Sequence, residues 1–152
     1  MEPTWVFAIL LAVGVAGYLL NIQTGVVATV AEAITGRLTA SQIAAYASDA
    51  GFSGDNLVTA VAVALAESSG NPNASGDNGT SYGLWQIHYT VHPEVLSGDD
   101  PSVLFDPARN AAAAMTVFQE QGWNAWSTYG TAPGHNNAYT KYLDDASQAV
   151  NA

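Results

Sequence analysis

The chain opens with an uncharged apolar run, residues 5–20, that has no polar face. As a helix this run would be about 24 Å long at ~1.5 Å per residue, slightly shorter than the ~30 Å hydrocarbon core of a bilayer. Residues 1–22 are therefore predicted to form a hydrophobic anchor helix, in a membrane or within a particle. Residues 23–40, which mix apolar side chains with Gly and Thr, are predicted to be a helical connector.

Two features bear on how this anchor is used. A cleaved signal peptide has Lys or Arg before its apolar run, whereas Glu2 stands there, so the segment is expected to stay on the chain. Ala8, Ala12 and Ala16 recur every four residues, and such a stripe of small side chains lets helices approach closely. Packing of this helix in a homo-oligomer is therefore the alternative to a helix embedded in lipid.

Beyond residue 40 the apolar positions recur at helical spacing. The strongest helix is predicted over 55–69, with Ser53 or Asp55 as its N-cap and Gly70 as a left-handed terminus. Further helices are predicted over 41–50, over 107–122 after the cap Asp106, and over 136–150.

Turn-forming residues follow the strongest helix in the segment "NPNASGDNGTS". Asn78-Gly79 predicts a tight hairpin turn that leads into the strand-like stretch "TSYGLWQIHY". Residues 41–152 are thus predicted to form one mainly α domain of the α+β class. One small β-hairpin is expected beside the end of its central helix.

The charge and the cysteine count narrow the classes of function. Three Lys and Arg stand against 13 Asp and Glu, which gives a formal net charge of -10. Binding to nucleic acid or to anionic lipid through basic side chains is therefore not expected. Zero cysteines exclude disulfides and thiol chemistry, so the fold does not depend on a redox compartment.

A lone carboxylate, Glu67, stands where the central helix gives way to the polar loop. Residues 61–65 before it are apolar, so Glu67 is expected at the edge of the core, where partial burial raises the pKa of a carboxyl group. A carboxyl group kept protonated near neutral pH can act as the general acid in glycosidic bond cleavage. The alternative is an exposed glutamate, or one paired with a loop amide.

Aromatic and amide side chains accompany Glu67 along the chain. Aromatic rings can stack on the apolar faces of sugars, and amides can bind hydroxyl and acetamido groups. The aromatic candidates are Tyr82, Trp85, Tyr89, Trp123, Trp126 and Tyr129. Packing in the core is the alternative for about half of them. The amide candidates are Asn71, Asn73, Asn78 and Gln86.

Three stretches carry a family resemblance. "ESSGNPNASG" resembles a helix-end Glu-Ser motif followed by Asn-Pro, "YGLWQI" resembles a Gly-Leu-x-Gln-Ile motif, and "LFDPARNAAAAMTVFQEQGWNAWSTY" resembles an Asp-Pro-x-x-Asn helix with a Trp-rich close. In this order and separation they are similar to the lysozyme-like superfamily, specifically its soluble lytic transglycosylase type in phages and actinobacteria. The resemblance covers residues 41–129 and implies a lysozyme-like fold.

The resemblance also implies roles for individual residues. Glu67 would be the catalytic acid and base, Ser75 the loop serine that touches the substrate, and Gln86 the glutamine that lines the cleft. Two departures stand out: His88 replaces a residue that is Met or Asn in many members, and the Ala-Tyr-Asn-x-Gly motif is absent. Tyr129 in "WSTYG" is predicted to replace its tyrosine, and the predicted substrate-binding residues are Ser75, Tyr82, Gln86, His88, Trp126 and Tyr129.

The implied reaction is cleavage of the β-1,4 bond between N-acetylmuramic acid and N-acetylglucosamine in peptidoglycan strands, with a 1,6-anhydro sugar as product. Such a lytic transglycosylase needs one carboxylate, whereas a hydrolase usually needs a second one about 5–9 Å away. Asp77 is the candidate for this second carboxylate, with a plain turn residue as its alternative.

The remaining expectations concern partners and metals. His88 and His92 lie four residues apart, but the stretch is not helical in pattern, and no convincing third ligand is near apart from Glu94 or the distant His135. Neither a metal nor a cofactor is therefore predicted. The retained anchor favours a phage virion enzyme, at an internal membrane or tail tip, over a bacterial envelope enzyme. A structural virion or membrane protein that keeps the fold without turnover is the alternative from another class.

Overall fold

The computed structural model describes residues 36–152. The predicted anchor, residues 1–22, and most of the predicted connector lie outside the described residues. Between residues 36 and 152, no helix is both long and apolar enough to cross a membrane. Residues 36–39, the end of the predicted helical connector, are irregular because Thr39 adopts the extended conformation of an N-cap.

The described chain is mainly helical. Its α-helices are α3 (Ala40–Asp49), α4 (Gly54–Ser68), α5 (Pro107–Gln121) and α6 (Leu143–Val150). Strands β1 (Ser75–Gly76), β2 (Ser81–Tyr82) and β3 (Ile87–His88) form an antiparallel sheet in that order. Short 3-10 helices complete the chain: η2 (Pro93–Leu96), η3 (Pro101–Phe105), η4 (Gly122–Ala125) and η5 (Ala138–Tyr142). The predicted α+β class is confirmed.

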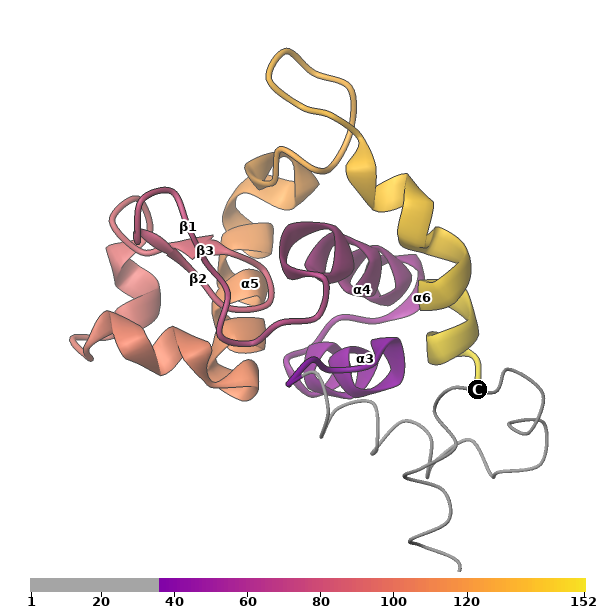
Figure 1. Cartoon of the computed structure of the whole chain (residues 1–152), viewed down its shortest axis with the longest axis horizontal. Helices are drawn as coiled ribbons and strands as arrows, with labels where there is room; N and C mark the ends of the chain where they lie inside the picture. The colour runs from indigo at the N-terminus through magenta and orange to yellow at the C-terminus, as the bar shows by residue number, and fades with distance from the viewer. Residues whose placement is uncertain (1–35) are drawn as a thin grey trace, which may run out of the picture.

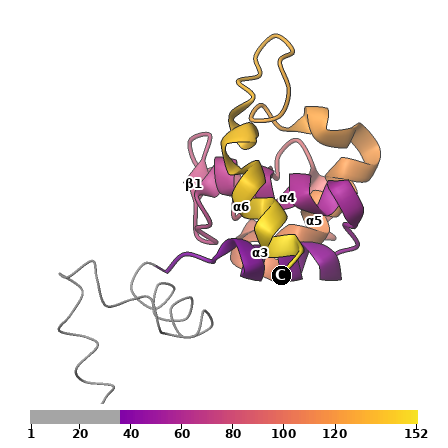
Figure 2. The same cartoon turned by 90° about the vertical axis from the view of Figure 1, so that its right-hand side faces the viewer.

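Helix α4 is the central element of the fold. It packs against α3, α6 and η5, and α5 packs against α3. Figure 1 shows the small sheet on the far side of α5 from α6, and Figure 2 shows α6 crossing over the other helices. In both views the segment between η4 and η5 projects from the body of the domain.

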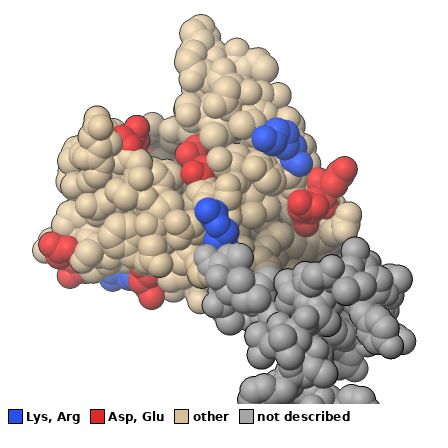
Figure 3. Space-filling view, viewed as in Figure 1, with Lys and Arg blue, Asp and Glu red and all other residues tan. Residues whose placement is uncertain are grey.

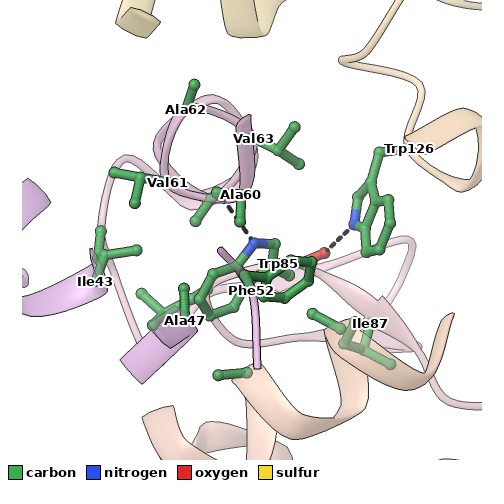
Figure 4. Close-up of a cluster of buried hydrophobic side chains, with 14 of the residues drawn as sticks. Ile43, Ala47, Phe52, Ala60, Val61, Ala62, Val63, Trp85, Ile87 and Trp126 are labelled. Atoms are coloured by element: carbon green, nitrogen blue, oxygen red, sulfur yellow. Dashed lines mark hydrogen bonds between the residues drawn. The ribbon is translucent and has the colours of Figure 1, made fainter. Parts of the chain in front are cut away.

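Trp85 fills the middle of the core, and its polar groups are satisfied there. Its side chain is fully buried, and its indole nitrogen donates to the carbonyl oxygen of Ala60 in α4 at 2.9 Å. Its own carbonyl oxygen accepts a hydrogen bond from the indole nitrogen of Trp126 at 2.8 Å. Figure 4 shows both bonds, with Val61, Val63 and Phe52 around the ring. Trp85 therefore joins the central helix to the Trp-rich segment.

The predicted helix boundaries hold to within about a residue for most of the chain. Helix α5 begins after the N-cap Asp106, whose carboxylate accepts from the backbone N–H of Arg109, and it ends at Gln121 with the predicted terminal residue Gly122 as its C-cap. Helix α4 follows Ser53 as predicted, but Ser69 is the left-handed C-cap and Gly70 comes one residue later.

Two predicted elements differ from the structure. The strand-like stretch after the hairpin is broken at 83–86 because Gly83 and Gln86 have positive φ, so a third strand, β3, follows the turn. The predicted helix 136–150 begins as the 3-10 helix η5, and α6 starts only at Leu143. Asn137, in the left-handed region at φ 56°, excludes helix at the expected start.

Candidate active site

Helix α4 places Glu67 in its last turn, and hydrogen bonds from residues that precede α3 hold the end of this helix. The guanidinium group of Arg37 donates to the carbonyl oxygens of Ser68 and Ser69 at 3.0 and 2.9 Å. The backbone N–H of Leu38 donates to the carbonyl oxygen of Gly70 at 2.8 Å. A Cβ at residue 70 would lie 2.5 Å from the carbonyl oxygen of Leu38, so only glycine fits there. Segment 37–38 therefore fixes where the helix stops.

The carboxyl group of Glu67 is half-buried and faces Thr128. The hydroxyl group of Thr128 donates to Oε1 of Glu67 at 2.7 Å. Burial raises the pKa of Glu67 above its usual value, although the hydroxyl group and the backbone amide of Thr128 favour the ionised form and lower the pKa. The negative charge of Asp77 raises this pKa further. The sequence expectation of a partly buried acid is confirmed.

The sequence pattern does not single out Thr128, although its hydroxyl group contacts the candidate acid Glu67. It is 7% exposed, and its carbonyl oxygen accepts from the backbone N–H of Tyr139 at 3.1 Å. The carbonyl oxygen of Ser127 accepts from the N–H of Asn136 at 2.8 Å. These two bonds close the base of the projecting segment seen in Figure 1 and hold Thr128 against the acid. The only sequence signal was its place beside the predicted Tyr129.

Tyr129 itself lies in a row of aromatic rings. Its ring centroid is 6.1 Å from that of Trp123 and 4.7 Å from that of Tyr139. Its carbonyl oxygen and Nδ1 of His135 are 2.5 Å apart. Tyr129 therefore packs against neighbouring aromatic rings, while the hydrogen bond to Glu67 comes from the preceding residue, Thr128.

Gln86 braces the loop beside the acid. Its side-chain nitrogen donates to the carbonyl oxygens of Ala74 and Gly83 at 3.1 and 2.9 Å. A Cβ at Gly76 would collide with the side-chain oxygen of Gln86, so the amide lies tightly over the strand β1. The amide group therefore fixes the shape of the hairpin, which is a sufficient reason for a glutamine at this position.

Three further predicted residues lie on the small sheet. Ser75 is exposed on β1 and pairs with Tyr82 on β2. Tyr82 is half-buried, with its ring centroid 4.4 Å from that of Phe105. His88 on β3 is half-buried, and its ring nitrogens lie 3.3 and 3.0 Å from the hydroxyl groups of Thr80 and Thr90. Of these three, Ser75 presents the most open side chain to a ligand.

Trp126 differs most from its expected environment. It is 5% exposed and its indole nitrogen is bonded to the carbonyl oxygen of Trp85. Little of its ring is therefore open to a sugar, and its main contribution is to the core.

Asp77 lies in the hairpin turn, and its negative charge raises the pKa of Glu67. It has a left-handed backbone, φ 50°, and its carboxylate accepts from the hydroxyl group of Ser81 at 2.5 Å. Asp77 therefore has the alternative role of a turn residue, and its charge also raises the pKa of Glu67.

Figure 3 shows the surface hollowed between the side that carries the sheet and the projecting segment.

A comparison with protein families shows to which family the chain belongs. The model of a lysozyme-like domain matches residues 44–128, a span that includes Glu67 and ends at Thr128. The chain belongs to the lysozyme-like domain family. Searches of curated proteins and of solved structures gave no match. Membership of this family indicates an enzyme of the glycosidase type that acts on peptidoglycan.

In this lysozyme-like domain, Thr128 is expected to set the pH dependence of Glu67. Thr128→Val keeps the shape of the side chain but removes a hydrogen bond that lowers the pKa of Glu67, so this pKa should rise further. Because the general acid must be protonated, the alkaline limb of kcat/KM should move to higher pH. Measured pH profiles of wild type, Thr128→Val and Thr128→Ser would test this, since serine keeps the hydroxyl group. An unmoved alkaline limb in the valine variant would contradict the assignment.

Proposed function

We propose that this lysozyme-like domain is a peptidoglycan lytic transglycosylase in which Glu67 acts alone as acid and base. The observation that carries the proposal is the half-buried Glu67 carboxyl group at the end of α4, held by Thr128 and with its pKa raised by burial. Such a group keeps its proton at higher pH than a free glutamate and has a fixed direction. Both properties are needed for protonation of a leaving oxygen.

The reaction needs no second carboxylate and no water. Glu67 donates its proton to the glycosidic oxygen as the bond from C1 of N-acetylmuramic acid breaks, and the acetamido oxygen of the same sugar bonds to C1. The Glu67 carboxylate then accepts the proton of the C6 hydroxyl group, whose oxygen displaces the acetamido oxygen at C1. The products are a 1,6-anhydro sugar and a free 4-hydroxyl group on N-acetylglucosamine, and Glu67 regains its proton.

A hydrolytic muramidase is the second candidate, because the negative charge of Asp77 raises the pKa of Glu67. In that scheme Asp77 would activate water or stabilise the cation. The hydrogen bond from Ser81 and the strained turn conformation give Asp77 a structural task, which favours the transglycosylase.

Analysis of the products distinguishes the two reactions. Full-length protein in detergent is incubated with purified sacculi, and the fragments are analysed by mass spectrometry. Anhydromuropeptides from wild type, and also from Asp77→Asn at a rate reduced by less than about tenfold, are the expected result. Fragments with reducing ends, lost in Asp77→Asn, would identify a hydrolase. No fragments under any condition would favour a structural protein that keeps the fold.

We further propose that residues 5–20 anchor the enzyme in a phage virion or in a bacterial envelope, where it opens the cell wall locally. The support is the uncharged apolar run in the sequence. Full-length protein is expected to require detergent during purification, whereas protein lacking residues 1–35 should not. Solubility of the full-length protein as a monomer without detergent would overturn the anchor, and soluble oligomers would support the assembly helix.

A further inference from the structure

A second group of titratable side chains lies away from Glu67, where η2 meets the end of α5. Ligand atoms of His92, Glu94 and Glu120 all lie within 4.8 Å of one another. Helix η2 carries Glu94, two residues after its N-cap His92, whereas Glu120 comes from the last turn of α5. The fold therefore brings together a histidine and two carboxylates from two elements.

His92 is held in place at the centre of this group. It is 9% exposed, and its backbone N–H donates to the carbonyl oxygen of His88 at 3.0 Å. Its Nδ1 lies 3.0 Å from Oε1 of Glu94, and its Nε2 lies 3.5 Å from the side-chain nitrogen of Gln121. A buried imidazole with both ring nitrogens directed at polar groups of neighbouring elements has few conformations to lose when a ligand binds.

The two carboxylates lack a compensating Lys or Arg within residues 36–152. Glu94 pairs with His92, and the side chain of Glu120 makes no hydrogen bond or ion pair with another described residue. The guanidinium group of the nearest basic residue in α5, Arg109, pairs with Asp99. A divalent cation would balance the two carboxylates that lie beside this imidazole.

We propose that His92, Glu94 and Glu120 form a zinc site that ties η2 to the end of α5. One imidazole nitrogen with two carboxylate oxygens is a donor set that suits zinc, whereas calcium and magnesium prefer oxygen donors alone. Zinc with bonds of about 2.0–2.2 Å holds its ligands roughly 3.4 Å apart, so the carboxylates must move inward by about 1 Å. Both glutamates are at the surface and can make this movement, and water completes the coordination.

Such a site would stabilise the part of the domain next to the proposed active site. Strand β3 leads into His92 through a short turn, and both β3 and η2 pack against α5. A metal bridge between η2 and α5 would therefore hold the sheet side of the domain, with Gln86 and Asp77, against the helical core. The inference does not depend on the proposed reaction.

The test uses full-length protein in detergent, stripped of metal and then equilibrated with zinc chloride. We expect one zinc per chain by elemental analysis and a higher unfolding temperature with zinc than without it. Loss of one ligand should weaken binding by at least about tenfold, so Glu120→Gln should lose both effects. Asp145→Asn, which removes an exposed carboxylate from α6, is the matched control and should behave as wild type.

Each other outcome contradicts the site. Equal zinc binding by wild type and Glu120→Gln would place the metal on other groups, and absence of stoichiometric zinc would leave a simple His92–Glu94 hydrogen bond. Equal stabilisation by calcium would exclude a role for the imidazole nitrogen. Cobalt in place of zinc adds a direct readout, since a four-coordinate site gives visible absorption that Glu120→Gln should abolish.

Discussion

Replacing Glu67 by Gln is expected to abolish cleavage of peptidoglycan, with kcat lowered by at least about 10³-fold. Glutamine has nearly the same shape and can still accept the hydrogen bond from Thr128. It has no acidic proton for the glycosidic oxygen, and its neutral amide cannot take the proton from the C6 hydroxyl group. Both proton transfers of the proposed reaction therefore fail at once. Release of soluble fragments from sacculi, followed over time, measures the effect.

The control for this experiment is an exposed carboxylate far from the acid in the sequence. Asp145→Asn on α6 removes one negative charge and should keep the wild-type rate, which accounts for the change in net charge. Circular dichroism shows whether each variant is folded. A Glu67→Gln protein that keeps more than a tenth of the activity would remove Glu67 from the reaction.

The same substitution, Glu67→Gln, should also show that the ionised Glu67 side chain lowers the stability of the folded protein. Because burial raises the pKa of Glu67 in the folded state, the folded protein binds the proton more tightly than the unfolded chain does. Stability is thus lost as the pH rises from the unfolded pKa through the folded one, and glutamine does not suffer this loss. Above that window the variant should unfold at a temperature no lower than wild type does, as expected for a site where function opposes stability.

Glu67 could be found from sequence because its signals are local. An apolar run at helical spacing, followed at once by turn residues, places the carboxyl group at the edge of a core without knowledge of the rest of the fold. The ends of α5 could be predicted for the same reason, since the N-cap Asp106 and the C-cap Gly122 act on residues close to them in the sequence.

Thr128 could not be found in this way. Its hydroxyl group reaches Glu67 across 61 residues of chain, and the bond depends on how the segment after η4 folds back over α4. The missing tyrosine motif indicates Tyr129, which is the next residue after Thr128 in the chain, and gives no indication of the hydrogen bond from Thr128 to Glu67. The exposure of individual aromatic rings could not be predicted from the sequence either. Trp126 is buried in the core, where its indole nitrogen bonds the carbonyl oxygen of Trp85, a residue far away in the sequence.

Asn110 shows how a motif can be recognised without its purpose. It is the last residue of the "DPARN" stretch, and nothing in the sequence pattern explains an amide at this position. In the structure it is fully buried. Its oxygen accepts from the backbone N–H of Trp85, and its nitrogen donates to the carbonyl oxygens of Tyr82 and Leu104, all at 2.9 Å. One side chain thus joins α5 to the turn that ends β2 and to the end of η3.

Replacing Asn110 by Ala is expected to lower the free energy of unfolding by about 3–6 kcal/mol. Three backbone groups would lose their partner in the interior, and each buried unsatisfied group costs about 1–3 kcal/mol. Gly83 packs directly against the amide and has φ +80°, so the turn is shaped to this side chain and cannot easily close over the gap. Unfolding in urea, followed by tryptophan fluorescence, measures the change.

Asn124→Ala is the matched control, since Asn124 is exposed on η4 and should change the free energy by less than about 0.5 kcal/mol. If Asn110→Ala lowered the free energy of unfolding as little as Asn124→Ala, water would have to replace the amide, and the turn at 82–85 would not depend on α5.

The loss of stability expected for Asn110→Ala has a further consequence for activity. The same turn carries Trp85 and leads into Gln86, which braces the hairpin that holds Asp77. A partly stable Asn110 variant should therefore lose activity at temperatures below its global unfolding transition, because the sheet side would detach from α5 first.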